Sequence, residues 1–234
     1  MNKEQAIEAL KAVATDDHFK KLSRFGIEDS KALGVKVPDI RQLARKIGKN
    51  YPLAVELWNS EIHEAHLLAA FIADSQNITE IYFDKIVYSF DSWDVCDLTC
   101  DILSETPFAE KKMYEYANNE LEFVKRTAFV LMCYFAVHHK KKNDDFFYPL
   151  LVLIERESWD ERNFVRKAVN WALRQIGKRN EALRQKAIET AERILKQDTK
   201  TAKWIANDAL RELRNEKIIA RVMKKTRTKN ETSR

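Results

Sequence analysis

The sequence predicts an all-helical fold, and two observations support this expectation. The chain of 234 residues holds only 4 glycines and 4 prolines, so glycine makes up about 2% of it against roughly 7% in an average protein. Nucleotide-binding loops and β-turns need glycine where the backbone takes a positive φ or approaches a phosphate, and neither G-x-G-x-x-G nor a P-loop motif occurs. Apolar residues also recur at helical spacing along nearly the whole chain.

The helical periodicity predicts helices joined by short polar turns. Pro38, Pro52 and Pro107 suit the first turn of a helix, and Gly48 and Gly177 suit helix ends. The expected helices span residues 3–24, 38–48, 52–58, 61–73, 77–88, 92–104, 107–117, 120–139, 144–155, 160–176, 180–196, 199–213 and 215–225.

A repeated helix pattern predicts how these helices stack. Four expected helices carry alanine among larger apolar residues, which lets neighbouring helices approach closely; they lie at 64–74, 124–135, 165–177 and 202–213. Arg126 and Arg166 are 40 residues apart, and Leu173 and Leu210 are 37 apart. These intervals are typical of HEAT-like antiparallel helical pairs stacked into a curved solenoid with a concave face. A plain helical bundle is the alternative.

The chain has no linker rich in glycine, proline or serine, so we expect one domain over residues 1–225 and a basic, frayed tail over 226–234. No apolar run approaches the ~18 residues of a membrane span, and the N-terminus lacks the apolar core of a signal peptide. These features predict a cytoplasmic protein.

Charge is distributed unevenly along the chain. The net charge is +5, yet residues 162–234 hold 21 Lys and Arg against 8 Asp and Glu, whereas residues 1–161 hold 20 against 28. The C-terminal third therefore carries +13 and the rest −8. A basic concave face of this kind predicts a polyanionic partner, most often nucleic acid. Solvated helix faces are the alternative explanation.

The three cysteines predict no metal site. Cys96, Cys100 and Cys133 are an odd number, the first two are spaced by one helical turn, and no histidine lies close to them in sequence. We expect buried free thiols rather than zinc ligands.

The segment DSWDVCDLTCD at residues 91–101 is the densest candidate for chemistry. On a helix, Trp93, Asp97 and Asp101 share one face. One interpretation is that Asp91 caps the helix, Asp94 favours its positive N-terminus and the other aspartates are solvated. A second is that Asp97 faces a site beside the Trp93 indole. A third is a divalent metal bound by Asp94, Asp97 and Asp101.

Two further segments combine cations with apolar residues. In VRKAVNWALRQIGKR (165–179), Trp171 and Arg174 project on one face of a helix, which is either core packing or a site. The cations Arg166, Lys167, Lys178 and Arg179 lie close by in sequence. In EFVKRTAFVLMCYF (122–135), the Arg126 side chain either snorkels past an apolar helix or binds a phosphate.

These segments together resemble the DNA alkylation repair enzymes of the AlkD type, which are DNA glycosylases built from HEAT-like repeats. The resemblance runs from LSRFGIEDSKALGVKVPDIRQLARKI (22–47) through SWDVCD (92–97) and EFVKRTAF (122–129) to RKAVNWALRQIGKRN (166–180).

The resemblance implies a role for individual residues. It places the catalytic carboxylate on Asp97, the two indoles on Trp93 and Trp171, and a phosphate-facing guanidinium on Arg126. Arg174 is implied as a further contact to the DNA backbone. Where some members carry a tyrosine that contacts DNA, this chain has Phe25, which lacks that hydroxyl.

The implied reaction is removal of a cationic alkylated purine, such as 3-methyladenine or 7-methylguanine, from duplex DNA without cofactor, metal or obligate protein partner. Alkylation makes the base a good leaving group, so a fixed carboxylate that stabilises an oxocarbenium-like transition state and orients water suffices. The family is understood to work from an open surface that leaves the base in the duplex. The alternatives are a non-catalytic relative that binds distorted or branched DNA, and a helical scaffold for a protein partner.

Overall fold

The structure, a computed structural model, describes residues 1–22, 27 and 29–232, and these residues form α-helices, short 3-10 turns and loops with no β-strand. The predicted all-helical class is therefore confirmed.

The chain divides into two compact units, Met1–Ala109 (unit 1) and Glu110–Arg234 (unit 2), and each is described by itself. The expectation of a single domain over 1–225 stays a prediction. Within the described part of the chain, no helix has the length and hydropathy needed to cross a membrane.

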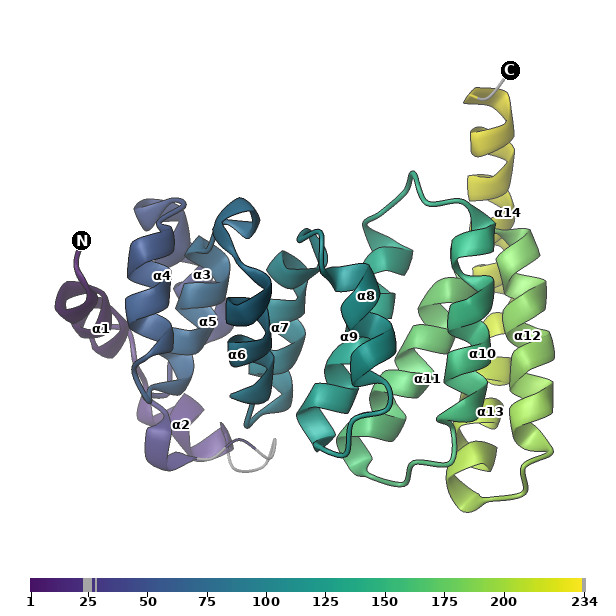
Figure 1. The fold of residues 1–234 in the computed structure, drawn as a ribbon, viewed down its shortest axis with the longest axis horizontal. Coiled ribbons are helices and arrows are strands. Elements are labelled where there is room, and N and C mark those ends of the chain that lie inside the picture. Colours follow the sequence, from purple (N-terminus) through teal and green to yellow (C-terminus); the bar gives the residue numbers. More distant parts are fainter. Residues whose placement is uncertain (23–26, 28, 233–234) are drawn as a thin grey trace. The chain divides into compact units, whose positions relative to one another are not determined.

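Unit 1 is built around helix α5, which packs against α3, α4 and α7. Small residues on α5, among them Ala65, Ala69 and Ala70, are buried at these contacts, as their pattern in the sequence predicted. The helices of unit 1 are α1 (Lys3–Lys11), α2 (Asp16–Leu22), α3 (Val37–Ile47), α4 (Tyr51–Trp58), α5 (His63–Ile72), α6 (Glu80–Tyr88) and α7 (Trp93–Ser104) (Figure 1).

The first expected helix, residues 3–24, is wrong as a single element because the chain breaks between α1 and α2. The Thr15 backbone N–H donates to the Gly34 carbonyl at 3.0 Å rather than continuing the helix. Gly34 has φ +87°, and a Cβ atom there would lie 2.8 Å from the Thr15 oxygen. This close approach of two backbone segments 19 residues apart in sequence thus separates α1 from α2, which periodicity alone does not reveal.

Glu64 fixes the loop before α3 to the first turn of α5. Its carboxylate is fully buried and accepts the backbone N–H groups of Leu33 (2.8 Å), Gly34 (2.7 Å) and Val35 (3.0 Å). Three charge-assisted bonds offset the desolvation of one buried carboxylate. Without them, the loop would leave three backbone donors unsatisfied.

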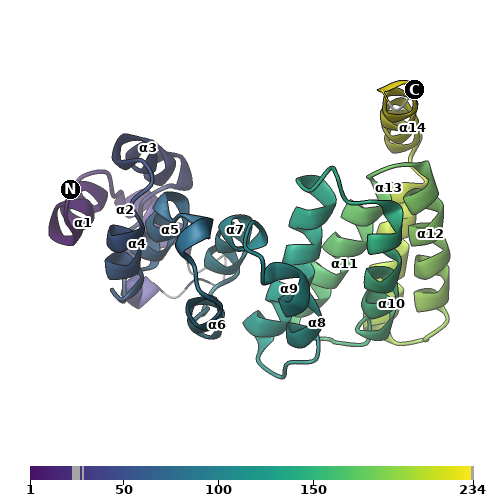
Figure 2. The ribbon, with the colours of Figure 1, turned by 45° about the horizontal axis from the view of Figure 1, so that its top comes forward.

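Unit 2 is built around α11, which packs against α9, α12 and α13, while α12 also packs against α10 and α13. Figure 1 shows α10 and α12 in front of α11 and α13, and Figure 2 shows the same helices from a second direction. Its helices are α8 (Ala109–Tyr116), which begins at the unit boundary, α9 (Glu122–Val137), α10 (Tyr148–Arg156), α11 (Asn163–Gly177), α12 (Glu181–Leu195), α13 (Lys200–Leu213) and α14 (Glu216–Thr232).

Local signals explain the starts of three helices in unit 2, α10, α12 and α13. The side chains of Asn180 and Thr199 cap α12 and α13 by accepting backbone N–H groups. The helix expected over 144–155 begins later, at Tyr148, because a 3-10 turn capped by Asn143 precedes it and Pro149 occupies its first turn. Helix α14 continues past residue 225 to Thr232.

Polar contacts between successive helical pairs recur at a nearly constant sequence separation. In unit 2, the bonds of Arg126 to Phe164, Asn170 to Asp208 and Arg174 to Glu212 each span 38 residues. In unit 1, the bonds of Trp58 to Ser89 and His63 to Asp94 each span 31 residues. Each repeat therefore contacts its neighbour in one register. The intervals of 37 and 40 found in the sequence both fall in unit 2 and lie close to its period.

We predict that Glu64→Ala destabilises unit 1 by about 3 kcal/mol or more, because two buried backbone N–H groups and one partly buried N–H group lose their acceptor. Equilibrium urea unfolding followed by circular dichroism measures the change. Glu56→Ala, which removes an exposed glutamate from α4, should change the free energy of unfolding by less than about 0.5 kcal/mol. Equal effects of the two substitutions would contradict the role assigned to Glu64.

Candidate nucleic-acid interface

Helix α7 presents Trp93 and Asp97 on one face, one turn apart. The opposite face, with Val95, Cys96 and Cys100, is buried in the core of unit 1. Trp93 and Asp97 are half-buried, and Asp101, one turn further on, is exposed. Burial of the apolar face thus turns the predicted Trp–Asp–Asp row toward the accessible side of the helix.

The aspartates of α7 have different surroundings. Ser92, not Asp91, is the N-cap residue, and no side-chain capping bond forms, which corrects the expectation for Asp91. Asp94 is buried in the first turn, and its Oδ1 accepts the Val95 N–H at 3.0 Å. A carboxylate at this position is stabilised by the positive helix N-terminus, as the sequence predicted.

The thiols of α7 and α9 belong to the core. Cys96, Cys100 and Cys133 are free and buried, as predicted. Among the described residues, no group of three or more His, Cys, Asp or Glu side chains is arranged to hold a metal ion. The arrangement of aspartates along α7 therefore gives no support to the metal interpretation.

A buried ion pair fixes α7 to α5. His63 Nε2 lies 2.9 Å from Asp94 Oδ2, and the two side chains are 6% and 12% exposed. Burial, the largest influence, lowers the pKa of His63, but the hydrogen bond and charge of Asp94, with the charges of Glu64 and Asp91, outweigh it and raise the pKa above its usual value. The pair therefore holds the helix that carries Trp93 and Asp97 at its first turn.

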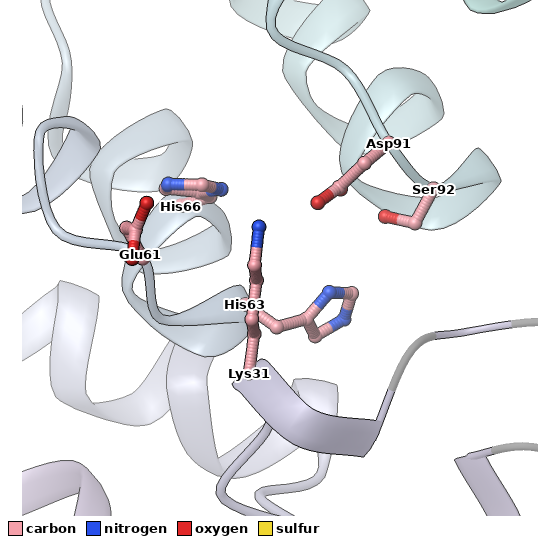
Figure 3. Close-up of a pocket in the computed structure, with 6 residues that line it drawn as sticks. All are labelled: Lys31, Glu61, His63, His66, Asp91 and Ser92. Carbon is pink, nitrogen blue, oxygen red and sulfur yellow. The ribbon is translucent and has the colours of Figure 1, made fainter.

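A small pocket opens beside this pair (Figure 3). His63, His66, Asp91 and Ser92 line it together with Lys31 and Glu61, and its volume is about 10 Å³. This space is far smaller than the roughly 300 Å³ or more of an ordinary ligand pocket. It does not admit a nucleobase.

In unit 2, Trp171 and Arg174 lie three positions apart on helix α11, and both are half-buried. Arg174 and Lys178, which directly follows α11, are paired with α13. Arg174 lies 2.6 Å and Lys178 lies 2.7 Å from carboxylate oxygens of Glu212. Burial by itself raises the pKa of Glu212. The hydrogen bonds and charges of Lys178 and Arg174 lower it by more, so the pKa of Glu212 is below its usual value.

Two arginines predicted to contact DNA are engaged with backbone oxygens. Arg126 is 5% exposed, and its guanidinium donates to the Phe164 carbonyl at 2.5 Å. Arg179 donates to four carbonyls that follow the end of α9 or belong to its last turn, including Ala136 at 2.7 Å and Lys142 at 3.1 Å. A cation at this point satisfies carbonyls that the helix end leaves without partners.

The remaining predicted cations are more accessible. The Arg166 guanidinium lies 5.2 Å from the centre of the Trp204 ring, and Trp204 is 39% exposed. Lys167 is exposed and makes no polar contact with the described residues. Phe25 lies outside the described residues.

The predicted residues therefore form one pair in unit 1, Trp93 and Asp97, and one group in unit 2 that includes Trp171.

Two accessible cations of unit 1, Arg41 and Arg45, escaped the sequence interpretation because the N-terminal part of the chain is acidic in sum. The sequence did contain a signal for this pair. Arg41 and Arg45 are four residues apart in RQLARK, and this spacing places both cations on one face of a helix.

We predict that His63→Gln costs more stability at pH 5.5 than at pH 9. A raised pKa in the folded state means that protonated His63 stabilises the protein below about pH 6.5, its unfolded value, and that this contribution is lost as the pH rises through the folded value. Urea unfolding of the wild type and variant at both pH values measures the difference. His138→Gln, at an exposed position, is the control, and a cost for His63→Gln that grows toward pH 9 would contradict the ion pair.

Similarity to known proteins agrees with this architecture. One solved structure superposes with a TM-score of 0.75 at 20% sequence identity, over 91% of this chain and 95% of that chain. It is described as a new family of proteins related to the HEAT-like repeat DNA glycosylases with affinity for branched DNA structures. The fold is therefore of the HEAT-like repeat class that the 37- and 40-residue intervals predicted.

No curated protein matches the chain. Residues 6–213, nearly the whole chain, match the family model of the DNA alkylation repair enzyme. The helical repeats, the Trp–Asp face of α7 and this match lead to one conclusion: the chain belongs to the DNA alkylation repair enzyme family.

Proposed function

We propose that this protein is a monofunctional DNA glycosylase that hydrolyses the N-glycosidic bond of cationic alkylated purines in duplex DNA. The observation that carries the proposal is the face of α7, where the half-buried Asp97 follows Trp93 by one turn and the buried His63–Asp94 pair fixes the helix. A carboxylate held rigidly at a partly accessible surface is what cleavage of a cationic nucleoside requires.

The proposed chemistry needs little more than this carboxylate. As the glycosidic bond lengthens, positive charge moves from the alkylated base onto the deoxyribose, and Asp97 stabilises that charge and orients the attacking water. At ~4 Å and an effective dielectric of about 20, one charge contributes on the order of 4 kcal/mol, close to three decades of rate. Trp93 adds roughly 0.5 to 2 kcal/mol by attracting the cationic nucleotide, and a π-face attraction of the same size to the bound DNA is the role proposed for Trp171 of unit 2.

The proposed DNA contacts differ in how they act. Lys167 is exposed and Arg166 is half-buried, and both are proposed to bind phosphates directly. Arg174 and Lys178 are paired with Glu212. To bind a phosphate, each must either contact the phosphate and Glu212 together or leave Glu212 for the phosphate. Arg126 is proposed to act largely through the start of α11, because its guanidinium donates to Phe164.

A second candidate function is binding of distorted or branched DNA without base excision. The observation that favours it is the description of the structurally similar protein as having affinity for branched DNA structures. Both candidates use the same helical surface, and they differ in whether Asp97 performs chemistry.

We predict that the wild type releases 7-methylguanine from alkylated duplex DNA and that Asp97→Asn lowers the single-turnover rate by a factor between about ten and a thousand, because the neutral amide no longer stabilises the oxocarbenium-like transition state. Chromatography of the released base measures the rate. The affinity for DNA should stay the same or rise slightly, since a negative charge is removed.

Asp145→Asn is the matched control, because it makes the same chemical change at an exposed position of unit 2 and should leave the rate unchanged. Absence of base release by the wild type, with DNA binding retained, would reject the glycosylase and favour the second candidate. Equal rates for Asp97→Asn and the wild type would reject Asp97 as the catalytic carboxylate.

We predict that binding to undamaged duplex DNA weakens steeply with salt, because phosphate contacts release counterions. Lys167→Ala should lower the slope of log affinity against log salt concentration by about 1. Lys196→Ala, which removes an exposed cation at the end of α12, should leave the slope unchanged. Fluorescence anisotropy at several salt concentrations measures both, and a flat response of the wild type would exclude nucleic acid as the partner.

A further inference from the structure

A wide groove crosses the surface of unit 1 between α3, α5 and α7. Its volume is about 420 Å³, within the roughly 300 to 1,000 Å³ of sites that hold small molecules or single nucleotides. All of its lining residues belong to unit 1, and none of them was singled out by the sequence as a binding residue except Asp101, which was one of the aspartates weighed as metal ligands.

One wall of the groove carries two available guanidinium groups. Arg41 and Arg45 lie one turn apart on α3, and both are exposed. Neither forms an ion pair with a carboxylate of the described residues. They differ in this from Arg174 and Lys178, which the sequence favoured but which pair with Glu212. Two guanidinium groups one helical turn apart and without carboxylate partners suit a phosphate.

The floor of the groove is apolar and includes a stacked cation. Phe71, Leu98 and Ile102 line it, and the Arg41 guanidinium lies 4.3 Å from the centre of the Phe71 ring. A planar guanidinium on an aromatic ring forms a platform on which a nucleobase stacks. At Gly48, a Cβ atom would meet nothing within 4 Å, so the groove is open at that end of α3.

The opposite wall supplies a hydrogen-bond acceptor. Asp101 on α7 lines the groove, is exposed, and its carboxylate has no partner among the described residues. It lies one helical turn after Asp97 on the same helix, although Asp97 itself does not line the groove. A carboxylate accepts from the exocyclic amino group of a base such as cytosine, whereas thymine offers no such group.

We propose that this groove holds one unpaired nucleotide of the bound DNA. Its phosphate binds Arg41 and Arg45, its base lies on the apolar floor and the Arg41–Phe71 stack, and its amino group donates to Asp101. The proposal rests on DNA being the partner, as in the proposed function, and it adds a strand conformation and a base preference. Two guanidinium groups, an apolar lining and a carboxylate acceptor together match the phosphate, the base and the amino group of one nucleotide.

The test compares binding of the full-length protein to a blunt duplex and to the same duplex with a three-nucleotide overhang of dC or of dT, by fluorescence anisotropy. The wild type should bind the dC overhang about threefold or more tightly than the dT overhang, and either overhang more tightly than the blunt duplex. Arg45→Gln should weaken overhang binding about fivefold or more. Its effect on the blunt duplex should be no greater than that of Lys46→Gln, the matched control that removes one exposed charge from the same helix.

Asp101→Asn should abolish the preference for dC while leaving the preference for an overhang over the blunt duplex. Equal weakening of overhang binding by Arg45→Gln and Lys46→Gln would overturn the proposal. So would equal weakening of overhang and blunt duplex by Arg45→Gln, which would mean that the groove binds the duplex backbone. Failure of the wild type to bind any of these DNAs would reject the proposed function itself, and base release by a protein without overhang preference would reject only this inference.

Discussion

The register between successive helical pairs is the constraint on which the rest of the structure depends. Apolar faces supply most of the free energy of folding, but they are not directional and tolerate small slides of one helix along another. Buried polar groups remove that freedom, because leaving one unpaired costs more than its bond contributes. Contacts that span 38 residues in unit 2 and 31 residues in unit 1 therefore select one alignment of each pair against the next.

The candidate site inherits its geometry from this register. Glu64 and His63 are neighbours in the first turn of α5. Glu64 binds an earlier segment of the chain, the loop before α3, and His63 binds a later residue, Asp94 of α7. One turn of helix thus positions both walls of the groove that contains Arg41 and Asp101. The face with Trp93 and Asp97 is held by the same contact, since Asp94 lies between them in sequence.

Charge illustrates where sequence reasoning reaches its limit. Counting placed the basic surface in the C-terminal third, yet several of those cations are engaged there: Arg174 and Lys178 with Glu212, and Arg179 with carbonyl oxygens around the end of α9. The cations without carboxylate partners that line a groove belong to the part of the chain that is acidic in sum. A net charge adds residues regardless of their neighbours, whereas a ligand meets only the charges that the fold leaves unpaired.

The sequence by itself determined the helical class, most helix positions, the HEAT-like interval in unit 2 and the shared face of Trp93 and Asp97, because each of these follows from periodicity or spacing within a few turns. Only the tertiary structure decided that Asp94 pairs with His63, that Thr15 binds Gly34 where the expected first helix divides into α1 and α2, and that Arg41 and Arg45 line one groove with Asp101. These contacts join residues that are tens of positions apart. Their partners are chosen by how whole helices pack, and no local pattern encodes that choice.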